Sequence, residues 1–325
     1  MLNTYRPAFR LLLGCLCFAT LTGSATAVAA ELVSQVRPGT LPIAWSSGSP
    51  QCTRLSPEFQ VHAYNEDLFI LRESGCVNDE KPFLYLLFGQ DKAILFDTGA
   101  GSHAVAGRPD VAAVVQRVIA GWLLRNQRRT IPLVVSHLHS HGDHTYGDFQ
   151  FAGLPNVTLV PPGDVSALQT AFGIGSWPDS IAAYDLGQRV LDIIPIPGHD
   201  ATSIAVYDRQ TGILLTGDTL YPGRIYVNGD PDVFTASVQR LVDFTRGKIV
   251  THVLGTHVEQ KAAYADYPVG TTYAPYEAPL ALSRGHLLEL LDASRDRAAD
   301  GSIVQRWFRD FSLCGPYPSC NRVNQ

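Results

Sequence analysis

Four residues of the kinds that bind metals fall within six consecutive positions of this chain, directly after an apolar segment typical of a buried strand. The segment covers residues 131–135, and H-x-H-x-D-H follows at His139, His141, Asp143 and His144. Side chains two apart in extended chain point the same way, so His139 and His141 can hold one ion. Asp143 and His144 are adjacent and diverge, so they can reach a second ion. Imidazole and carboxylate without thiolate suit Zn²⁺, and also Fe or Mn.

Four further segments carry a histidine or an aspartate at or after the end of an apolar run. They are 93–99 (A-I-L-F-D-T-G), 197–200 (P-G-H-D), 214–220 (L-L-T-G-D-T-L) and 253–257 (V-L-G-T-H). Together with H-x-H-x-D-H, and in this order, they resemble the metallo-β-lactamase superfamily over most of the chain after its first thirty residues. A lone H-x-H would favour a histidine-rich surface loop that binds nothing, whereas five ordered motifs form a far more specific signal.

The resemblance implies a ligand set and a reaction class. The implied ligands are His139, His141 and His199 for the first metal, Asp143, His144 and His257 for the second, and Asp218 as a bridge. Water held between two cations ionises near neutral pH and attacks a carbonyl carbon, so the implied chemistry is metal-assisted hydrolysis by a dinuclear zinc enzyme. Asp143 is also expected to accept a proton during catalysis. Asp97 is expected either to orient a ligand histidine or its loop, or to cap its own turn.

Residues beside these motifs are candidates for contacting the substrate. Tyr221 is a candidate donor to a developing oxyanion, with simple packing at the rim as the alternative. Arg224 is a candidate for binding a substrate carboxylate through its planar guanidinium. His137 extends the H-x-H spacing backwards, but the register of the motif predicts a buried neighbour of the ligands instead. Residues 264–277, rich in Pro and Tyr, form either a loop over the pocket or an ordinary surface loop.

Residues 1–30 have the pattern of a secretory signal peptide. Two arginines form a basic start, residues 11–21 are apolar, and an A-x-A cleavage site follows. The apolar stretch is too short for a transmembrane helix. Cleavage near Ala29 or Ala30 would leave a single mature domain, residues 31–325, in the periplasm or outside the cell. An uncleaved anchor is the alternative interpretation.

Four cysteines follow the expected signal peptide, and none lies in a metal motif. An even number of cysteines in an oxidising compartment favours disulfides over metal ligands. Three pairings are possible, and Cys52–Cys76 with Cys314–Cys320 is preferred because each bond closes a local loop.

The charge of the chain gives no reason to expect nucleic acid or an anionic membrane as a partner. The formal net charge is −5, and it becomes −7 without residues 1–30, which carry two arginines and no acidic residue. A mildly acidic chain without a basic run lacks the usual footprint of such partners. The expected partner is a small-molecule substrate, with no stable membrane insertion after signal removal. No feature of the sequence speaks to the oligomeric state.

Apolar periodicity predicts two similar halves, before and after about residue 180. The expected elements are strand hairpins at 83–96 and 203–216, strands at 131–135, 249–254 and 303–308, and helices at 109–126, 230–244 and 283–297. The pattern alone indicates an α/β protein of two layers or more. The resemblance implies the four-layer αββα sandwich of the family, with the motifs along one rim.

Three functions compete at this stage. The leading hypothesis is a secreted or periplasmic dinuclear zinc hydrolase of a lactone, ester, thioester or β-lactam, which the motifs do not separate. Asp218 stands at the strand end where one β-lactamase subclass has a metal-binding cysteine, which argues against that subclass. A mononuclear iron enzyme of the sulfur-dioxygenase type is opposed by the full second ligand set. A non-catalytic zinc-stabilised protein is opposed by ligand positions left open for water.

Overall fold

The computed structural model describes residues 1–2, 36–37, 39–101, 110–263, 265–318 and 320, and the chain divides into the units Met1–Gln35 and Val36–Gln325. The expected signal peptide lies outside the described residues, except for its first two positions. All described helices and strands belong to the second unit, to which the following description is confined.

Two six-stranded sheets form the centre of this unit. The first has the order β1 (Phe59–Asn65), β2 (Leu68–Glu73), β3 (Phe83–Phe88), β4 (Ala93–Phe96), β5 (Leu133–Ser136), β6 (Val157–Leu159). The second has the order β15 (Ala281–Leu282), β12 (His252–Gly255), β10 (Ile213–Gly217), β9 (Ile204–Asp208), β8 (Val190–Pro195), β7 (Ala182–Asp185). The hairpins expected in each half are therefore confirmed.

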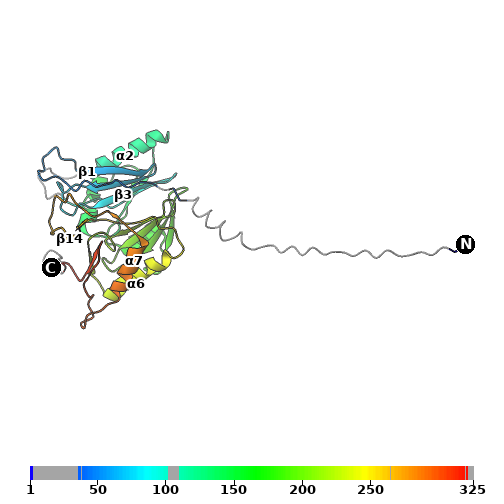
Figure 1. Ribbon diagram of the computed structural model, residues 1–325. Helices are drawn as coiled ribbons and strands as arrows, with labels where there is room; N and C mark the ends of the chain where they lie inside the picture. The colour runs from blue at the N-terminus through cyan, green and yellow to red at the C-terminus, as the bar shows by residue number, and fades with distance from the viewer. Residues whose placement is uncertain (3–35, 38, 102–109, 264, 319, 321–325) are drawn as a thin grey trace. The chain divides into compact units, whose positions relative to one another are not determined.

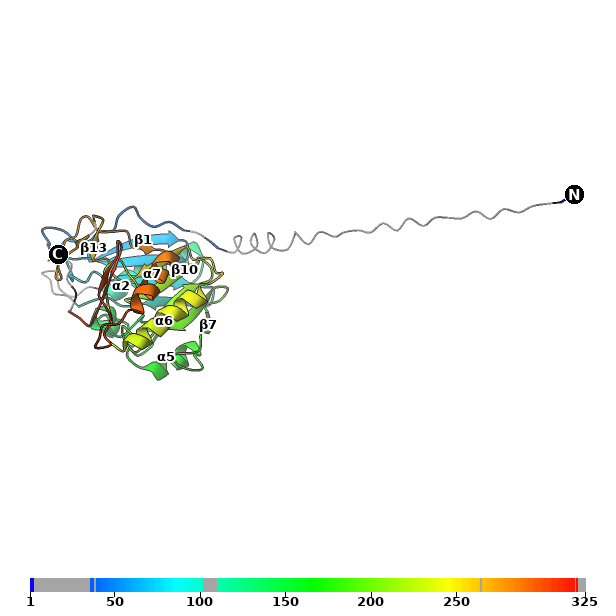
Figure 2. The same ribbon diagram turned by 60° about the horizontal axis from the view of Figure 1, so that its bottom comes forward.

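Helices cover the outer faces of both sheets. Helix α2 (Val111–Arg125) lies outside the first sheet, and α6 (Pro231–Phe244) and α7 (Arg284–Ser294) lie outside the second (Figure 1). Figure 2 brings α6 and α7 to the front, with the short α5 (Val165–Phe172) beside them. Two further single-turn helices, α3 (Gly142–Thr145) and α4 (Asp148–Phe151), follow β5. The order helix, sheet, sheet, helix is the four-layer αββα sandwich that the resemblance implied.

The two halves repeat one connection. Helix α2 lies in the connection from β4 to the parallel strand β5, and α6 lies in the connection from β10 to the parallel strand β12, after a short strand at Arg224–Tyr226. Parallel neighbours need such a crossover because a tight turn can only join antiparallel strands. Both helices begin at an aspartate whose side chain accepts a backbone N–H, Asp110 from Ala113 and Asp230 from Asp232.

Strand β3 shows why its sequence is apolar at every position. Phe83, Tyr85 and Leu87 belong to the core between the two sheets. Leu84, Leu86 and Phe88 belong to the cluster under α2. Successive side chains of a strand alternate between the faces of its sheet, and here both faces are buried.

Short strands complete the unit at the C-terminal end. A three-stranded sheet has the order β11 (Arg224–Tyr226), β17 (Ser312–Cys314), β16 (Arg306–Trp307), and a two-stranded one joins β13 (Gln260–Lys261) and β14 (Ala265–Asp266). The closing strand expected at 303–308 is only the two residues of β16. The pattern missed its partner β17, because three residues are too few to show periodicity.

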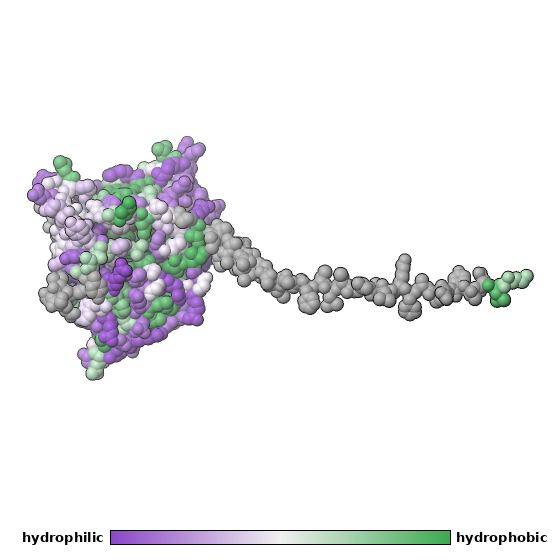
Figure 3. Space-filling view, viewed as in Figure 1, coloured by the Kyte–Doolittle hydropathy of each residue, from purple (hydrophilic) through white to green (hydrophobic). Residues whose placement is uncertain are grey.

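Both expected disulfides are confirmed. Cys52 is bonded to Cys76 and Cys314 to Cys320. Among the described residues no helix has the length and apolar character needed to cross a membrane. The face drawn in Figure 3 mixes hydrophilic and hydrophobic residues.

Candidate metal centre

The ends of several strands meet at one edge of the sandwich and carry the motif residues there. Strands β8, β10 and β12 run in the same direction, because β9 is antiparallel to both β8 and β10 and β12 is parallel to β10. His199, Asp218 and His257 follow these three strands. The H-x-H-x-D-H segment follows β5 in the other sheet. Residues far apart in sequence thus come together at the carboxyl ends of strands from both sheets.

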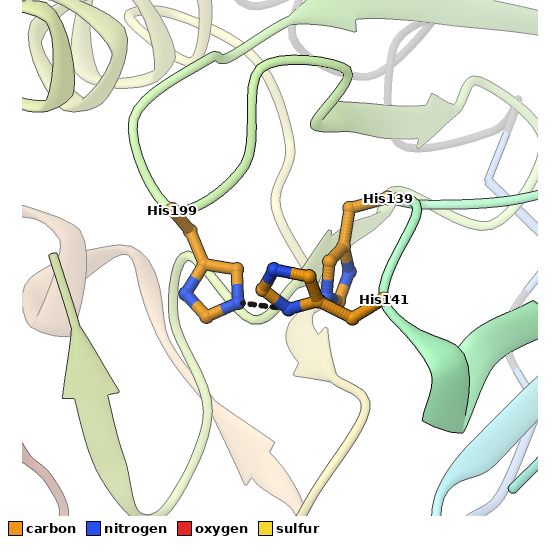
Figure 4. A group of neighbouring side chains, drawn as sticks. All are labelled: His139, His141 and His199. Carbon is orange, nitrogen blue, oxygen red and sulfur yellow. Dashed lines mark hydrogen bonds between the residues drawn. The ribbon is translucent and has the colours of Figure 1, made fainter. Parts of the chain in front are cut away.

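The first group consists of His139, His141 and His199, whose ring nitrogens converge on one point (Figure 4). Nδ1 of His141 lies 3.0 Å from Nε2 of His139 and 3.2 Å from Nε2 of His199. Figure 4 shows His139 and His141 on one loop and His199 on another, facing them.

The second group consists of Asp143, His144, Asp218 and His257. Oδ2 of Asp143 lies 3.2 Å from Nε2 of His144 and 3.2 Å from Nε2 of His257. Oδ2 of Asp218 lies 3.6 Å from Nε2 of His144 and also 3.6 Å from Nε2 of His199 in the first group. The Asp218 carboxylate therefore stands between the two groups.

Hydrogen bonds on the outer side fix the tautomers of three histidines. Nδ1 of His144 donates to Oδ2 of Asp97 at 3.0 Å. Nδ1 of His199 donates to the carbonyl oxygen of Tyr226, and Nδ1 of His257 to that of Glu80, each at 2.9 Å. Because a carbonyl or carboxylate oxygen can only accept, the neutral rings must present the lone pair of Nε2 to the interior of the site.

This donor set fits metal ions. Imidazole lone pairs and two carboxylates face one another, and Nε2 of His144 is buried without a hydrogen-bond partner among the described residues although Asp143 lies beside it. Acceptors at such distances repel each other unless a proton or a cation lies between them. Three nitrogens in one group, and two nitrogens with two carboxylates in the other, match the ligand sets of zinc sites.

Asp97 holds a histidine of the second group, which agrees with the first of its two expected roles. Besides holding His144, it accepts the backbone N–H of Leu138 through Oδ1 at 2.8 Å, so one carboxylate ties both ends of the H-x-H-x-D-H loop. Asp97 has a left-handed backbone, φ 69°, an uncommon conformation for a non-glycine residue. His137 is buried close to both groups but belongs to neither of them. Its Nε2 lies 3.1 Å from Oδ2 of Asp148.

The family model described as the metallo-beta-lactamase superfamily matches residues 79–255, more than half of the 325-residue chain. The chain belongs to the metallo-beta-lactamase superfamily. The family suggested by the five motifs is therefore confirmed, and with it the prediction of a metal-dependent hydrolase at the level of the superfamily.

Known proteins that are similar to this chain align with different fractions of its length. A hydroxyacylglutathione hydrolase from Erythrobacter litoralis is 24% identical over 53% of this chain and 61% of its own length. The chain thus spans less than two thirds of that relative. An acyl-coenzyme A thioesterase from Bos taurus is 21% identical over 66% of this chain and 87% of its own length. A solved metallo-beta-lactamase from Pontibacter korlensis is 16% identical, with a TM-score of 0.45, over 74% of this chain and 100% of that one.

The pKa shifts of the buried acidic and histidine residues in this site favour the binding of a cation. Burial favours the neutral form of Asp218, but His257, His144 and His139 outweigh it and lower the pKa of Asp218 well below its usual value. Burial disfavours the charged form of His257, yet Asp218 and Asp143 raise the pKa of His257 well above its usual value. The carboxylates are therefore held ionised in a buried place, which favours a cation there.

One glycine is required beside the ligands. Gly198, with φ 144°, precedes His199, and a Cβ atom built on it would lie 2.6 Å from Cα of Phe234 in α6. No larger residue fits between this loop and the helix. Gly198 thus permits the close approach that sets His199 against the rest of the first group.

A cavity of about 450 Å³ opens beside both ligand groups. Its inner wall includes five residues of the two groups, His141, Asp143, His199, Asp218 and His257. Its outer wall includes residues 267–271 and Ala274, so the middle of the segment expected at 264–277 lines the pocket. Residue 264 lies outside the described residues. A pocket of this size is typical of small-molecule sites.

Tyr221 and Arg224 line the cavity, but protein atoms engage their polar groups. The hydroxyl of Tyr221 donates to the carbonyl oxygen of Arg224 and lies 3.3 Å from Oε2 of Glu259. The guanidinium donates to Oε1 of Glu259 at 2.7 Å and to the carbonyl oxygen of Tyr267 at 2.8 Å. To stabilise an oxyanion, Tyr221 would have to give up its present hydrogen-bond partner, and to bind a substrate carboxylate, Arg224 would have to do the same. Both roles stay predictions.

Sequence reasoning missed several residues that support either the metal-ligand candidates or the residues beside them. The backbone carbonyls of Glu80 and Tyr226 leave no trace in a motif, because any residue supplies a carbonyl. Asp148 gave a weak signal, four positions after His144 in the segment that folds as α3 and α4. Glu259 gave another weak signal, because it follows His257 by two positions. In an extended chain, side chains two positions apart point to the same side.

Proposed function

We propose that this chain is an exported dinuclear zinc hydrolase that cleaves a small carboxylic ester, thioester or lactone, with β-lactams as the further class to be tested. The observation that carries the proposal is the set of inward lone pairs on His144, His199 and His257, fixed from outside and facing the carboxylates of Asp143 and Asp218. The names of a hydroxyacylglutathione hydrolase and an acyl-coenzyme A thioesterase among the relatives support a thioester or ester over other carbonyl compounds.

The ligand residues have distinct places in this proposal. His139, His141 and His199 would hold one zinc ion, Asp143, His144 and His257 the other, and Asp218 would contact both. The zinc ions would supply Lewis acidity and lower the pKa of a water molecule toward neutrality. A site built on strand ends, with hydrogen-bond partners behind three of its histidines, favours a fixed geometry during turnover.

Asp143 is the residue best placed to accept a proton. Its side chain is 23% exposed and lines the cavity, whereas that of Asp218 is 8% exposed and accepts a hydrogen bond from Thr256 Oγ1. A carboxylate at the cavity wall can take a proton from water and return it to the leaving group. Asp97, together with the carbonyls of Glu80 and Tyr226, keeps the three histidines from rotating away.

The test combines metal analysis with turnover. The purified mature protein is expected to contain two zinc ions per chain, to hydrolyse p-nitrophenyl esters, acyl thioesters or lactones, and to lose activity on chelation and regain it with zinc. A chromogenic cephalosporin in the same panel tests the β-lactam class. One iron ion per chain without hydrolysis would overturn the proposal in favour of a mononuclear iron enzyme. Two zinc ions with no turnover of any substrate would favour a zinc-stabilised binding protein.

Export is part of the proposal and has its own test. The basic and apolar start of the sequence and the two disulfides support it, because disulfides persist in oxidising compartments. Intact mass of the protein secreted or recovered from the periplasm is expected to correspond to a start close to residue 30 or 31. An uncleaved chain in the membrane fraction would support the anchor instead.

A further inference from the structure

The outer part of the cavity has an apolar and aromatic wall. Val258, Tyr267, Val269 and Ala274 line it on one side, and Tyr226 and Tyr317 line it as well. The rings of Tyr226 and Tyr317 pack edge to face at 5.2 Å. The hydroxyl of Tyr267 accepts the backbone N–H of Tyr276, so this tyrosine offers its ring rather than a free acceptor. A wall of this kind binds apolar groups.

The positive charge of Arg224 is compensated inside the protein. Its side chain is 2% exposed, and Glu259 receives Nη2 on Oε1 at 2.7 Å and the Arg224 backbone N–H on Oε2, also at 2.7 Å. Removing one partner of such a buried pair would leave an uncompensated charge. Glu259 thus neutralises the charge of Arg224, to which a substrate carboxylate would otherwise bind.

Lys81 is the other cationic side chain lining the cavity, and it too is engaged. Its ammonium donates to the carbonyl oxygens of Asp79 and Thr271, the latter at 2.6 Å. The acidic residues Asp79 and Glu80 line the same cavity. An anionic group in the outer pocket would therefore meet engaged cations and acidic residues.

We propose that Glu259 is a specificity-determining residue, and that the outer pocket accepts an uncharged, apolar acyl chain and disfavours one that ends in a carboxylate. This inference rests on the proposed hydrolase function and names the substrate class within it. Discrimination arises because an anion entering the pocket loses its hydration without gaining a free counter-charge. An apolar chain meets the tyrosine and valine side chains and gains by leaving water.

The first test compares two p-nitrophenyl esters with acyl chains of equal carbon count, the valerate, which ends in a methyl group, and the hydrogen glutarate, which ends in a carboxylate. The zinc-loaded enzyme is expected to prefer the valerate in kcat/KM by at least about tenfold, the effect of one poorly compensated charge near a protein surface. Activity on both esters with a ratio near one, or a preference for the glutarate, would overturn the inference while leaving the hydrolase proposal intact. Zinc-dependent hydrolysis of neither ester in this or the wider substrate panel would count against the hydrolase proposal itself.

The second test removes the negative charge that neutralises Arg224. Glu259→Gln keeps the size of the side chain but removes its charge, so Arg224 becomes available to a substrate carboxylate. The valerate-to-glutarate ratio is expected to fall by about tenfold or more, mainly through a lower KM for the glutarate. Glu289→Gln, the same change at an exposed position of α7, is the control and should leave the ratio unchanged. A soluble Glu259→Gln protein with the wild-type ratio would overturn the role of Glu259, and if the variant does not fold, the wild-type ratio alone decides the inference.

Discussion

The metal-facing half of the pocket stands on strand ends, whereas its outer wall is the loop at residues 267–274. Three histidines of the inner half have a hydrogen-bond partner behind them, Asp97 for His144 and the carbonyls of Tyr226 and Glu80 for His199 and His257. The outer wall is held by other contacts, from Arg224 to the Tyr267 carbonyl, from Lys81 to the Thr271 carbonyl and from the Ser47 hydroxyl to the Ala274 carbonyl. The difference suggests that reaction chemistry and substrate choice are carried by separately supported parts of the chain.

This division explains why superfamily members that share one ligand motif can differ in substrate. The inner residues must meet a fixed geometry for the metals, so their identity and spacing are constrained. The outer loop must only fit a substrate, and loops tolerate replacement. The following changes separate the two halves, beginning with the largest expected effect.

Asp218→Asn should abolish most activity, because Oδ2 of Asp218 lies between both ligand groups. An amide is a weaker ligand and carries no charge to hold two cations. We expect kcat/KM to fall by about a thousandfold or more, with loss of bound zinc in elemental analysis. Asp292→Asn, on the exposed side of α7, is the matched control. An Asp218→Asn enzyme with two zinc ions and normal turnover would contradict the bridging role.

Asp97→Asn should weaken the inner half without removing a ligand. Asp97 accepts with both carboxylate oxygens, whereas the asparagine amide has only one oxygen. In either orientation its NH₂ group would face His144 or the Leu138 N–H. We expect zinc affinity, measured by competition with a chelator, to fall by about 10- to 100-fold. The control is Asp310→Asn, which changes a carboxylate 3.0 Å from Nε2 of His286 on the surface and should leave zinc affinity unchanged. Equal effects of the two variants would rule out a specific role for Asp97.

Replacing Cys52 and Cys76 together with serine should act on the outer half. This disulfide closes a 24-residue separation, and Cys76 follows Gly75, where an added Cβ would meet the Thr272 carbonyl. Loop-closure entropy predicts a loss of about 3 kcal/mol in the free energy of unfolding, against about 2 kcal/mol for the six-residue separation of Cys314 and Cys320. Denaturant unfolding measures both. KM should also rise for the Cys52/Cys76 variant while zinc content stays at the wild-type value, and a loss of zinc would show that the halves are not independent.

Asp110→Ala should affect neither half. Asp110 caps α2 by accepting the backbone N–H of Ala113 at 2.9 Å, on the far side of the first sheet. Losing this cap should cost about 1 kcal/mol of stability in thermal or urea unfolding, with unchanged kcat and KM. Asp110→Asn retains a capping oxygen and should lie close to wild type. A change in turnover with Asp110→Ala would indicate that the site responds to the packing of α2.

The sequence predicted the inner half far better than the outer one. The ligand candidates, Asp97 and the two disulfides were accessible because chemistry or local loop length restricts their residue types. Helix α6 began and ended close to the predicted range, since Asp230 and Pro231 mark its start. Glu259 and Lys81 escaped notice because their importance depends on what they face across the pocket. The two-residue strands β13, β14 and β15 escaped because they are shorter than any periodic pattern.

The distribution of ligands between the halves has a consequence for how the protein is made. Neither half carries a complete set, since His139, His141, Asp143 and His144 precede about residue 180, while His199, Asp218 and His257 follow it. During synthesis the earlier residues emerge with no partners to complete a site. A metal ion held by either complete group would therefore bind only after residues from both halves have come together, so metal binding and the docking of the two halves would be coupled.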